Sequence, residues 1–349
     1  MSRRSKAIAA ITAGVIVVGG GAVAFIFFGD ELGDKIPIIS EITEPDTCPL
    51  NGEEPNNADL IGRPAVAVKV ENAQLAYPLS GLGNAEIVYE EVVEGGVTRF
   101  MAIYHCTDSD KVGPVRSARA VDPAIMIPIT RILAYSGQNA PVLRALEEAD
   151  IVRIDESNAK GSMERVPREG LSSEHTLYAD TGKVREVASD KFDESPPEEV
   201  FEFGDLEKDG TKSGKQVNIS FSDFTNVRYE FSDGTYKRFQ PRDNSFDLEE
   251  GGQLEVDNVL IEEHEVNNSD IVDVQGNPST EIADETGKGN AVLFRDGRAI
   301  VGSWVRKSTD DLVRFETKSG DQMVFKPGNI WIHLVPSDKG EVKGSFTFE

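Results

Sequence analysis

A single long apolar segment near the N-terminus restricts this chain more than any other feature. Residues 7–28 read AIAAITAGVIVVGGGAVAFIFF and contain no charged side chain. About 20 apolar residues, at about 1.5 Å of rise each, are enough for a helix to cross the hydrocarbon core of a bilayer. Arg3, Arg4 and Lys6 precede the segment, and such basic flanks stay on the cytoplasmic side. We therefore predict a cytoplasmic tip over residues 1–6, one transmembrane helix over 7–28, and export of everything that follows.

A cleaved signal peptide is the alternative interpretation of this segment. Signal peptides have a shorter apolar region, of roughly 7–15 residues, which ends at a small-x-small cleavage site. Here the run is longer and ends in the bulky residues 25–28, while the passable cleavage site at 22–24 lies inside it. A lipidated N-terminus would need a cysteine just beyond the run, but the first cysteine is Cys48. These features favour an uncleaved, single-pass anchor in the cell membrane.

The remainder of the chain has the length and composition of two exported domains behind a tether. At 349 residues, it exceeds the usual size of one small domain. Residues 29–59 are rich in Pro, Asn, Asp and Glu without a sustained period, which predicts a disordered tether. The formal net charge of −25 repels nucleic acid, so we expect no nucleic-acid partner.

The two cysteines, Cys48 and Cys106, predict a covalent link between the tether and the first domain. In an exported protein, a cysteine pair is more often oxidised than reduced. Two unrelated thiols are the alternative. A redox role is not expected, because the spacing of the two residues is far from Cys-x-x-Cys.

Residues 60–195 predict an α/β domain. Short apolar runs alternate there with helical patterns, which is typical of a largely parallel sheet with helices packed on it. One strand is expected to carry Phe100, Ala102 and Tyr104 on a single face. Residues 84–93 fit a helix or a half-buried strand equally well. In such domains, binding sites lie in loops beyond the carboxyl ends of the strands.

Residues 196–349 predict a mostly β domain, either a small sandwich or a barrel. Short strands follow one another at steady spacing and are divided by hairpin-type turns such as 232–234 and 295–298. Trp304 and Trp331 are expected in the core rather than as ligand platforms. The overall class is therefore α+β, after one N-terminal transmembrane helix.

An arginine cluster is the strongest candidate for a binding site. A Gly-Pro turn is followed by Arg116, Ser117 and Arg119, which precede a helical run. A second turn begins at Glu94 and places Arg99 at the start of a strand. Guanidinium groups bind carboxylates and phosphates, and a helix start adds free backbone N–H groups. These residues predict an anion site.

The charge distribution gives this cluster some weight. Residues 95–170 hold ten basic and ten acidic side chains, whereas residues 241–290 hold two basic and fourteen acidic ones. The alternative is a structural role, in which the arginines pair with Glu91, Glu94 or Asp122 and hold the loops in place.

His175 is the candidate for acid–base chemistry. A histidine in a predicted loop fits a general acid or base, but it also fits an ordinary hydrogen-bonded loop residue. Ser117 as a nucleophile would need His175 beside it, and no Gly-x-Ser-x-Gly elbow supports this. The histidines are scattered and no zinc-type cysteine spacing occurs, so we expect neither a metal nor a cofactor.

Two motifs resemble a known family. GGVTRF at residues 95–100 and GPVRSAR at residues 113–119 are similar to segments of the YerB-like family of bacterial cell-envelope lipoproteins, which has a domain of unknown function. The resemblance covers most of the exported part, including SEHTLY at residues 173–178. Two departures are the apolar anchor in place of a lipidation cysteine and a less glycine-rich loop at residues 136–140. The resemblance implies location and architecture more than activity.

The sequence thus predicts a membrane-anchored extracytoplasmic module of the bacterial cell envelope. We expect it to bind an anionic ligand or a protein partner, or to serve in assembly. The rival hypothesis is an envelope hydrolase or transferase that uses His175 with arginine clamps.

Overall fold

The computed structural model describes residues 13–18, 21–26, 38–41 and 47–349, except residues 193, 208, 274 and 275. The chain divides into two units, Met1–Asp46 and Thr47–Glu349. In the first unit, three short strands pair antiparallel in sequence order. They are β1 (Ala13–Val18), β2 (Gly21–Ile26) and β3 (Ile38–Glu41).

The sequence predicts a transmembrane helix over residues 7–28, but the described part of this segment forms strands. There the chain adopts β1 and β2, in keeping with the high strand propensity of its Val and Ile residues. No helix among the described residues is long and apolar enough to cross a membrane. The predicted cytoplasmic tip, and residues 29–37 and 42–46 of the predicted tether, lie outside the described residues.

The end of the predicted tether is folded onto the second unit. Cys48 forms a disulfide with Cys106, and the side chain of Leu50 is fully buried. The carbonyl oxygen of Asn51 accepts a hydrogen bond of 2.8 Å from the backbone N–H of Gly328. A covalent bond and one buried leucine therefore order a stretch whose polar composition predicted disorder.

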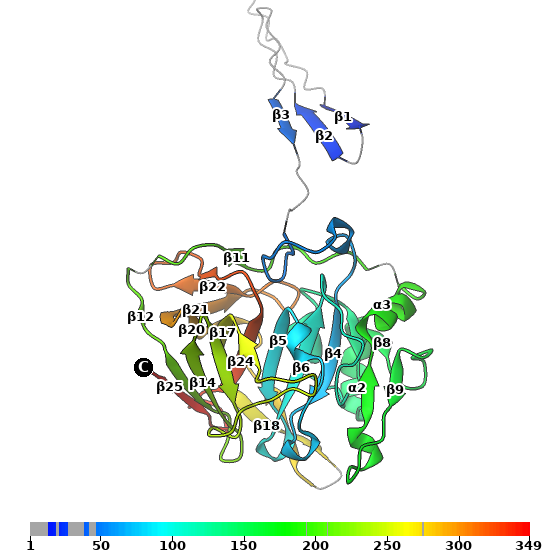
Figure 1. Ribbon diagram of the computed structural model, residues 1–349, viewed down its shortest axis with the longest axis vertical. Coiled ribbons are helices and arrows are strands. Elements are labelled where there is room, and N and C mark those ends of the chain that lie inside the picture. Colours follow the sequence, from blue (N-terminus) through cyan, green and yellow to red (C-terminus); the bar gives the residue numbers. More distant parts are fainter. Residues whose placement is uncertain are drawn as a thin grey trace, which may run out of the picture. The chain divides into compact units, whose positions relative to one another are not determined.

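A mixed eleven-stranded sheet runs through the second unit (Figure 1). Its strand order is β12-β21-β20-β17-β24-β5-β6-β4-β7-β8, with β22 also paired to β21. The strands from the first half of the chain are β4 (Val66–Glu71), β5 (Ile87–Val92), β6 (Thr98–Tyr104), β7 (Ile132–Ala134) and β8 (Val152–Ile154). Those from the second half are β12 (Lys212–Ser213), β17 (Asn258–His264), β20 (Gly287–Arg295), β21 (Arg298–Arg306), β22 (Arg314–Thr317) and β24 (Ile330–Pro336).

The two regions predicted as domains share this sheet. β24, from the end of the chain, pairs parallel with β17 on one side and with β5 on the other. In the first half, β6 runs antiparallel to β4 and β5, whereas β7 and β8 continue parallel to β4. The predicted largely parallel sheet is therefore mixed, because β5 and β6 form a hairpin.

Smaller sheets and short helices cover the large sheet. A five-stranded antiparallel sheet has the order β16-β15-β14-β13-β25. Its strands are β13 (Gln216–Ser220), β14 (Asn226–Ser232), β15 (Thr235–Phe239), β16 (Glu255–Val256) and β25 (Ser345–Phe348). Two-stranded pairs are β9 (Met163–Arg165) with β10 (Leu177–Ala179), β11 (Glu202–Phe203) with β23 (Val324–Phe325), and β18 (Val266–Val272) with β19 (Pro278–Ile282).

The helices are few and short, so the described part of the chain is mostly β. The α-helices are α1 (Asp122–Met126), α2 (Ala140–Glu148) and α3 (Thr181–Ser189). Single 3₁₀ turns are η1 (Ala58–Leu60), η2 (Gln74–Ala76), η3 (Leu82–Asn84), η4 (Glu94–Gly96) and η5 (Ser173–His175).

Both faces of the central strands of the large sheet are buried. Along β6, the predicted apolar face of Phe100, Ala102 and Tyr104 belongs to one core cluster, which also includes inward-facing residues of the five-stranded sheet. The alternate residues Met101 and Ile103 belong to a second cluster, together with residues of α1 and α2. Because successive side chains of a strand point to opposite faces of the sheet, β6 contributes apolar side chains to both cores.

A buried ion pair joins the two halves of the chain. Arg238 of β15 and Glu90 of β5 are both fully buried, with 2.9 Å between guanidinium and carboxylate. Arg238 also donates to the hydroxyl of Tyr229 at 2.6 Å, and its guanidinium lies 4.9 Å from the ring centre of Trp331. Burial alone would raise the pKa of Glu90, but Arg238 holds that pKa below its usual value.

Two predicted hairpin turns have the backbone conformation that their sequences indicate. Asp233 and Gly234, which connect β14 to β15, both have positive φ, as do Asp296 and Gly297 between β20 and β21. Two consecutive positive φ values are typical of a type I′ turn, which Asp-Gly favours.

Replacing Arg238 by Met should destabilise the protein strongly, because the buried carboxylate of Glu90 would lose its guanidinium partner and keep only His333 at 3.0 Å as an ionisable neighbour. The expected loss in the free energy of unfolding is about 3–5 kcal/mol, measured by urea denaturation. Lys160→Met is the matched control, since Lys160 pairs with Asp190 at the exposed surface, and it should cost less than about 1 kcal/mol. Equal losses for the two variants would contradict this assignment.

Candidate functional site

The candidate site forms at the carboxyl ends of β4, β5 and β7, where three loops meet. After β5, the turn η4 has positive φ at Gly95 and Gly96 and returns the chain into β6. The loop that carries Arg116 lies across the end of β4, because its backbone N–H donates to the Lys69 carbonyl at 2.9 Å. The N–H of Ser136, just after β7, donates in turn to the Arg116 carbonyl at 2.9 Å.

Arg119 is paired with Glu94. Its Nε donates to Glu94 Oε2 at 3.0 Å, and its Nη2 contacts the same oxygen. The other carboxylate oxygen of Glu94 accepts a 2.7 Å bond from Ser279 of β19, which ties the site to the second half of the chain. Burial would raise the pKa of Glu94, but Arg119 and Ser279 hold that pKa below its usual value.

Arg116 and His175 share the carboxylate of Glu71, the last residue of β4. Arg116 Nε lies 3.3 Å from Glu71 Oε2, and His175 Nδ1 lies 2.8 Å from the same oxygen. Arg116 also donates to the carbonyl oxygen of Glu174 at 3.0 Å. Burial raises the pKa of Glu71, against the opposing effect of its His175 and Arg116 partners.

Arg99 differs from the other two arginines because it makes no ion pair within the described residues. Its Nη1 donates to the Ser117 carbonyl at 2.9 Å, and Arg119 Nη1 approaches the same oxygen at 3.3 Å. Burial and then the charge of Arg119 lower the pKa of Arg99, although a guanidinium remains charged at neutral pH. Arg99 is therefore a half-buried cation that makes no ion pair of its own, although the charges of Glu94 and Glu91 partly offset the repulsion.

The predicted helix start beyond Arg119 does not offer a row of free N–H groups. The N–H of Asp122 donates to the Arg119 carbonyl at 3.1 Å, and Pro123, the next residue of α1, has no N–H. The carboxylate of Asp122 accepts the Arg119 N–H at 2.7 Å and an ion pair from Lys69 at 2.6 Å. The Asp122 carboxylate and Pro123 thus occupy the helix start at which the sequence predicts a ligand anion.

The hypothetical pair of Ser117 and His175 is not formed. Both ring nitrogens of His175 face carboxylates, Glu71 through Nδ1 and Glu174 through Nε2 at 3.4 Å. A base that activates a serine needs one ring nitrogen within hydrogen-bond reach of the hydroxyl. The geometry of His175 is that of a residue that positions a loop.

Sequence reasoning missed Glu71 and Lys69 as members of this site. Lys69 is fully buried and pairs with both Glu91 and Asp122, so these two acids, named as alternative arginine partners, are held mainly by a lysine. Both missed residues lie toward the carboxyl end of β4. Nearness to the edge where the loops of an α/β domain gather was the available signal.

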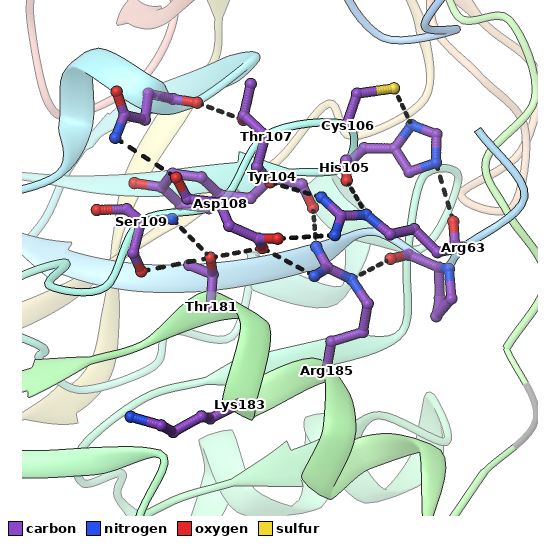
Figure 2. Close-up of polar contacts among 12 residues, drawn as sticks. Arg63, Tyr104, His105, Cys106, Thr107, Asp108, Ser109, Thr181, Lys183 and Arg185 are labelled. Atoms are coloured by element: carbon purple, nitrogen blue, oxygen red, sulfur yellow. Dashed lines mark hydrogen bonds and ion pairs between the residues drawn. The ribbon is translucent and has the colours of Figure 1, made fainter. Parts of the chain in front are cut away.

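A second polar cluster, around Asp108, holds α3 to the loop after β6 (Figure 2). Asp108 accepts bonds of 2.7 Å from Arg63, 2.8 Å from Arg185 and 2.9 Å from the hydroxyl of Thr181. Burial would raise the pKa of Asp108, but the bond and charge of Arg185 lower it. Both carboxylate oxygens are occupied, so this cluster is a structural clamp near the Cys106 disulfide.

No group of three or more His, Cys, Asp or Glu side chains converges as metal ligands in the described part of the chain. The side chains that meet at the site are guanidinium groups, carboxylates, one imidazole and the ammonium group of Lys69.

Comparison with known proteins places both halves of the chain in one family. Residues 50–195 match the family model described as "Protein of unknown function (DUF3048) N-terminal domain", and residues 216–332 match the C-terminal domain of the same family. The chain is 26% identical over 324 residues to "Putative lipoprotein YerB" of Bacillus subtilis, which covers 90% of this chain and 94% of that protein. The crystal structure of the B. subtilis YerB protein is similar with a TM-score of 0.70 and 25% identity, covering 86% of this chain and 99% of that one.

Replacing Glu94 by Gln should remove an acid-sensitive contribution to stability. Because the pKa of Glu94 is depressed from 4.5, its stabilisation is present above that value and is lost as the pH falls through the folded pKa. We expect the variant to lose roughly 1–3 kcal/mol at pH 7, measured by urea denaturation, and the difference from the unmodified protein to shrink below about pH 4. Glu164→Gln, at an exposed position, is the control; a pH-independent deficit in Glu94→Gln would contradict the ion-pair explanation.

Proposed function

Because the chain belongs to the DUF3048 family, whose two domains it carries, we propose that it is a binding or assembly module of the bacterial cell envelope. The second unit, outside the cytoplasmic membrane, recognises an anionic ligand through the arginine cluster of Arg99, Arg116 and Arg119. The first 28 residues attach the chain to the membrane.

Attachment and location are supported by the sequence and by the relative. Residues 7–28 carry no charge and are long enough for a membrane-spanning helix, with Arg3, Arg4 and Lys6 on the N-terminal side against Lys35 on the other. Backbone groups in lipid need internal hydrogen bonds, which favours a helix for a single crossing. The B. subtilis relative is described as a "Putative lipoprotein", which supports a place for this chain in the cell envelope.

The observation that carries the anion proposal is the guanidinium of Arg99. It has no carboxylate partner within the described residues and is bonded to the Ser117 carbonyl beside Arg119. The charges of Arg119 and Arg116 lower its pKa by repulsion, while those of Glu94 and Glu91, which make no ion pair with it, raise the pKa. A ligand carboxylate or phosphate would relieve this repulsion and occupy donors that Arg99 and Arg116 leave available.

A non-catalytic role is favoured over a hydrolase or transferase. His175 contacts Glu71 and Glu174 rather than a nucleophile, and Arg116 and Arg119 already hold carboxylates. To stabilise a transition state, Arg116 and Arg119 would first have to release these carboxylates and bind the substrate instead. Binding needs only the unpaired donors.

Membrane attachment is tested by placing a charge within the apolar segment. Val17→Lys should release the chain from the membrane fraction into the soluble fraction, because a lysine near the centre of a spanning helix costs about 2.5–3.5 kcal/mol. Ile39→Lys, in the predicted tether, is the control and should leave the chain membrane-bound. In intact spheroplasts, external protease should digest the second unit of the unmodified chain; complete protection would contradict the proposed orientation.

Anion recognition is tested by binding of the full chain to isolated bacterial cell-wall and lipid fractions. Arg99→Met and the double variant Arg116→Ala/Arg119→Ala should each lower the affinity by about tenfold or more, since each removes charge-assisted hydrogen bonds. Arg153→Ala is the matched control, because Arg153 pairs with Glu147, which is not a partner of the clustered arginines. Equal binding by all forms, or none by any, would sink the proposal.

A further inference from the structure

The five-stranded sheet ends in an unpaired strand, β25 (Figure 1). One side of β25 pairs with β13, and no strand of the described residues pairs with its other side. Gln216 and Glu349, at one end of this pairing, exchange backbone hydrogen bonds of 3.1 and 3.0 Å. Backbone groups in an antiparallel pair alternate in direction, so Thr347 also faces β13. Phe346 and Phe348 therefore direct their N–H and C=O groups outward, where they have no hydrogen-bond partner among the described residues.

The side chains of this strand are incompletely covered as well. Val217 and Ile219 of β13 are fully buried. The residues opposite them in β25, Phe348 and Phe346, are only half-buried. Their rings stack with 6.4 Å between centres. Two apolar side chains thus remain accessible on the side where a further strand would pack.

The large sheet continues beyond this edge. β14 lies over β24, since the ring centres of Tyr229 and His333 are 5.4 Å apart. β25 lies over β20, since the ring centres of Phe348 and Phe294 are 5.2 Å apart. The next strand of the large sheet is β21, so the five-stranded sheet ends one strand short of it. On the face that carries Phe294, β21 has three half-exposed side chains: Val301, Ser303 and Val305.

One extended strand would complete both layers. Its backbone could bond the four outward groups of Phe346 and Phe348, and its side chains would lie over β21. A second copy of this chain does not fit, because pairing through its own β25 would bring its β20 into the space that β21 of the first copy occupies. The net charge of −25 on each copy would also oppose that pairing.

We propose that the β25 edge, formed by the outward backbone groups of Phe346 and Phe348, binds an extended basic segment of a partner polypeptide. Backbone hydrogen bonds would supply affinity, and apolar side chains at alternate positions would pack against both rings and Val301. A basic side chain on the opposite face suits Glu349, which is exposed, and the acidic chain as a whole. This site shares no residue with the arginine cluster, so either proposal can fail while the other holds.

The test measures binding of a fluorescein-labelled peptide, Lys-Val-Thr-Val-Thr-amide, to the full chain in lipid nanodiscs by fluorescence anisotropy, with empty nanodiscs as the blank. In antiparallel pairing, its valines stand opposite Phe348 and Phe346 and its lysine opposite Glu349. The peptide should bind at one site per chain. Methylating the nitrogens of both valines removes the donors that face β25 and should lower the affinity about tenfold or more. Methylating those of both threonines, which face away, should leave the affinity unchanged.

Two substitutions at one position isolate the backbone donor. Phe348→Pro and Phe348→Ala both remove the ring, but only proline removes the outward N–H, which the pairing with β13 does not use. The proline variant should bind the peptide about fivefold or more weakly than the alanine variant. Val301→Trp, on the face of β21, should block the peptide even if neither Phe348 variant folds.

Hydrogen exchange reports which occupant the edge takes. In the free chain, the amides of Phe346 and Phe348 should exchange faster than that of Thr347, and the peptide should slow them. Slow exchange of both in the free chain would mean that a second copy or another segment of this chain is already paired there, and would overturn the proposal. Absence of peptide binding, equal affinity of the two methylated peptides, equal affinity of Phe348→Pro and Phe348→Ala, or unchanged binding in Val301→Trp would overturn it as well.

Discussion

The fully buried pair of Arg238 and Glu90 is the interaction on which the rest of this fold depends. Each charge loses its hydration on folding, and neither can be accommodated alone in an apolar interior. The aromatic rings around the guanidinium, Trp331 and Phe246 among them, provide favourable contacts only when β15 is seated against β5 and β24. The ion pair therefore favours one arrangement of the two halves of the chain. A shift of β15 relative to β5 would separate the two buried charges.

The same continuous sheet determines where chemistry can occur. Because both faces of its central strands are covered, the ends of the strands are the places where polar loops can gather. At one such edge, Glu71 closes β4 and the turn after β5 carries Glu94, so two carboxylates hold Arg116 and Arg119. Arg99 remains as the cation of this cluster that makes no ion pair within the described residues.

Local features of the fold follow from the sequence, whereas long-range ones do not. The alternation at Phe100, Ala102 and Tyr104 and the turn at Asp233-Gly234 depend on neighbouring residues, and both are seen in the structure. The parallel pairing of β24 with β5 joins strands far apart in the chain and leaves no local periodicity. For the site, residue types and loops were predictable, but the partners were not: Glu71 meets His175 only after the chain has folded.

The disulfide between Cys48 and Cys106 has a mechanical consequence. A force applied to the residues before Cys48 reaches the second unit at the disulfide. There it acts on Cys106, in the segment that directly follows β6. The load is then borne by a strand in the interior of the large sheet, with hydrogen-bonded neighbours on both sides, rather than by the residues that immediately follow Cys48. A chain held by its N-terminal end would thus transmit tension to β6 and the strands bonded to it, and the buried turn around Leu50 would not be pulled out first.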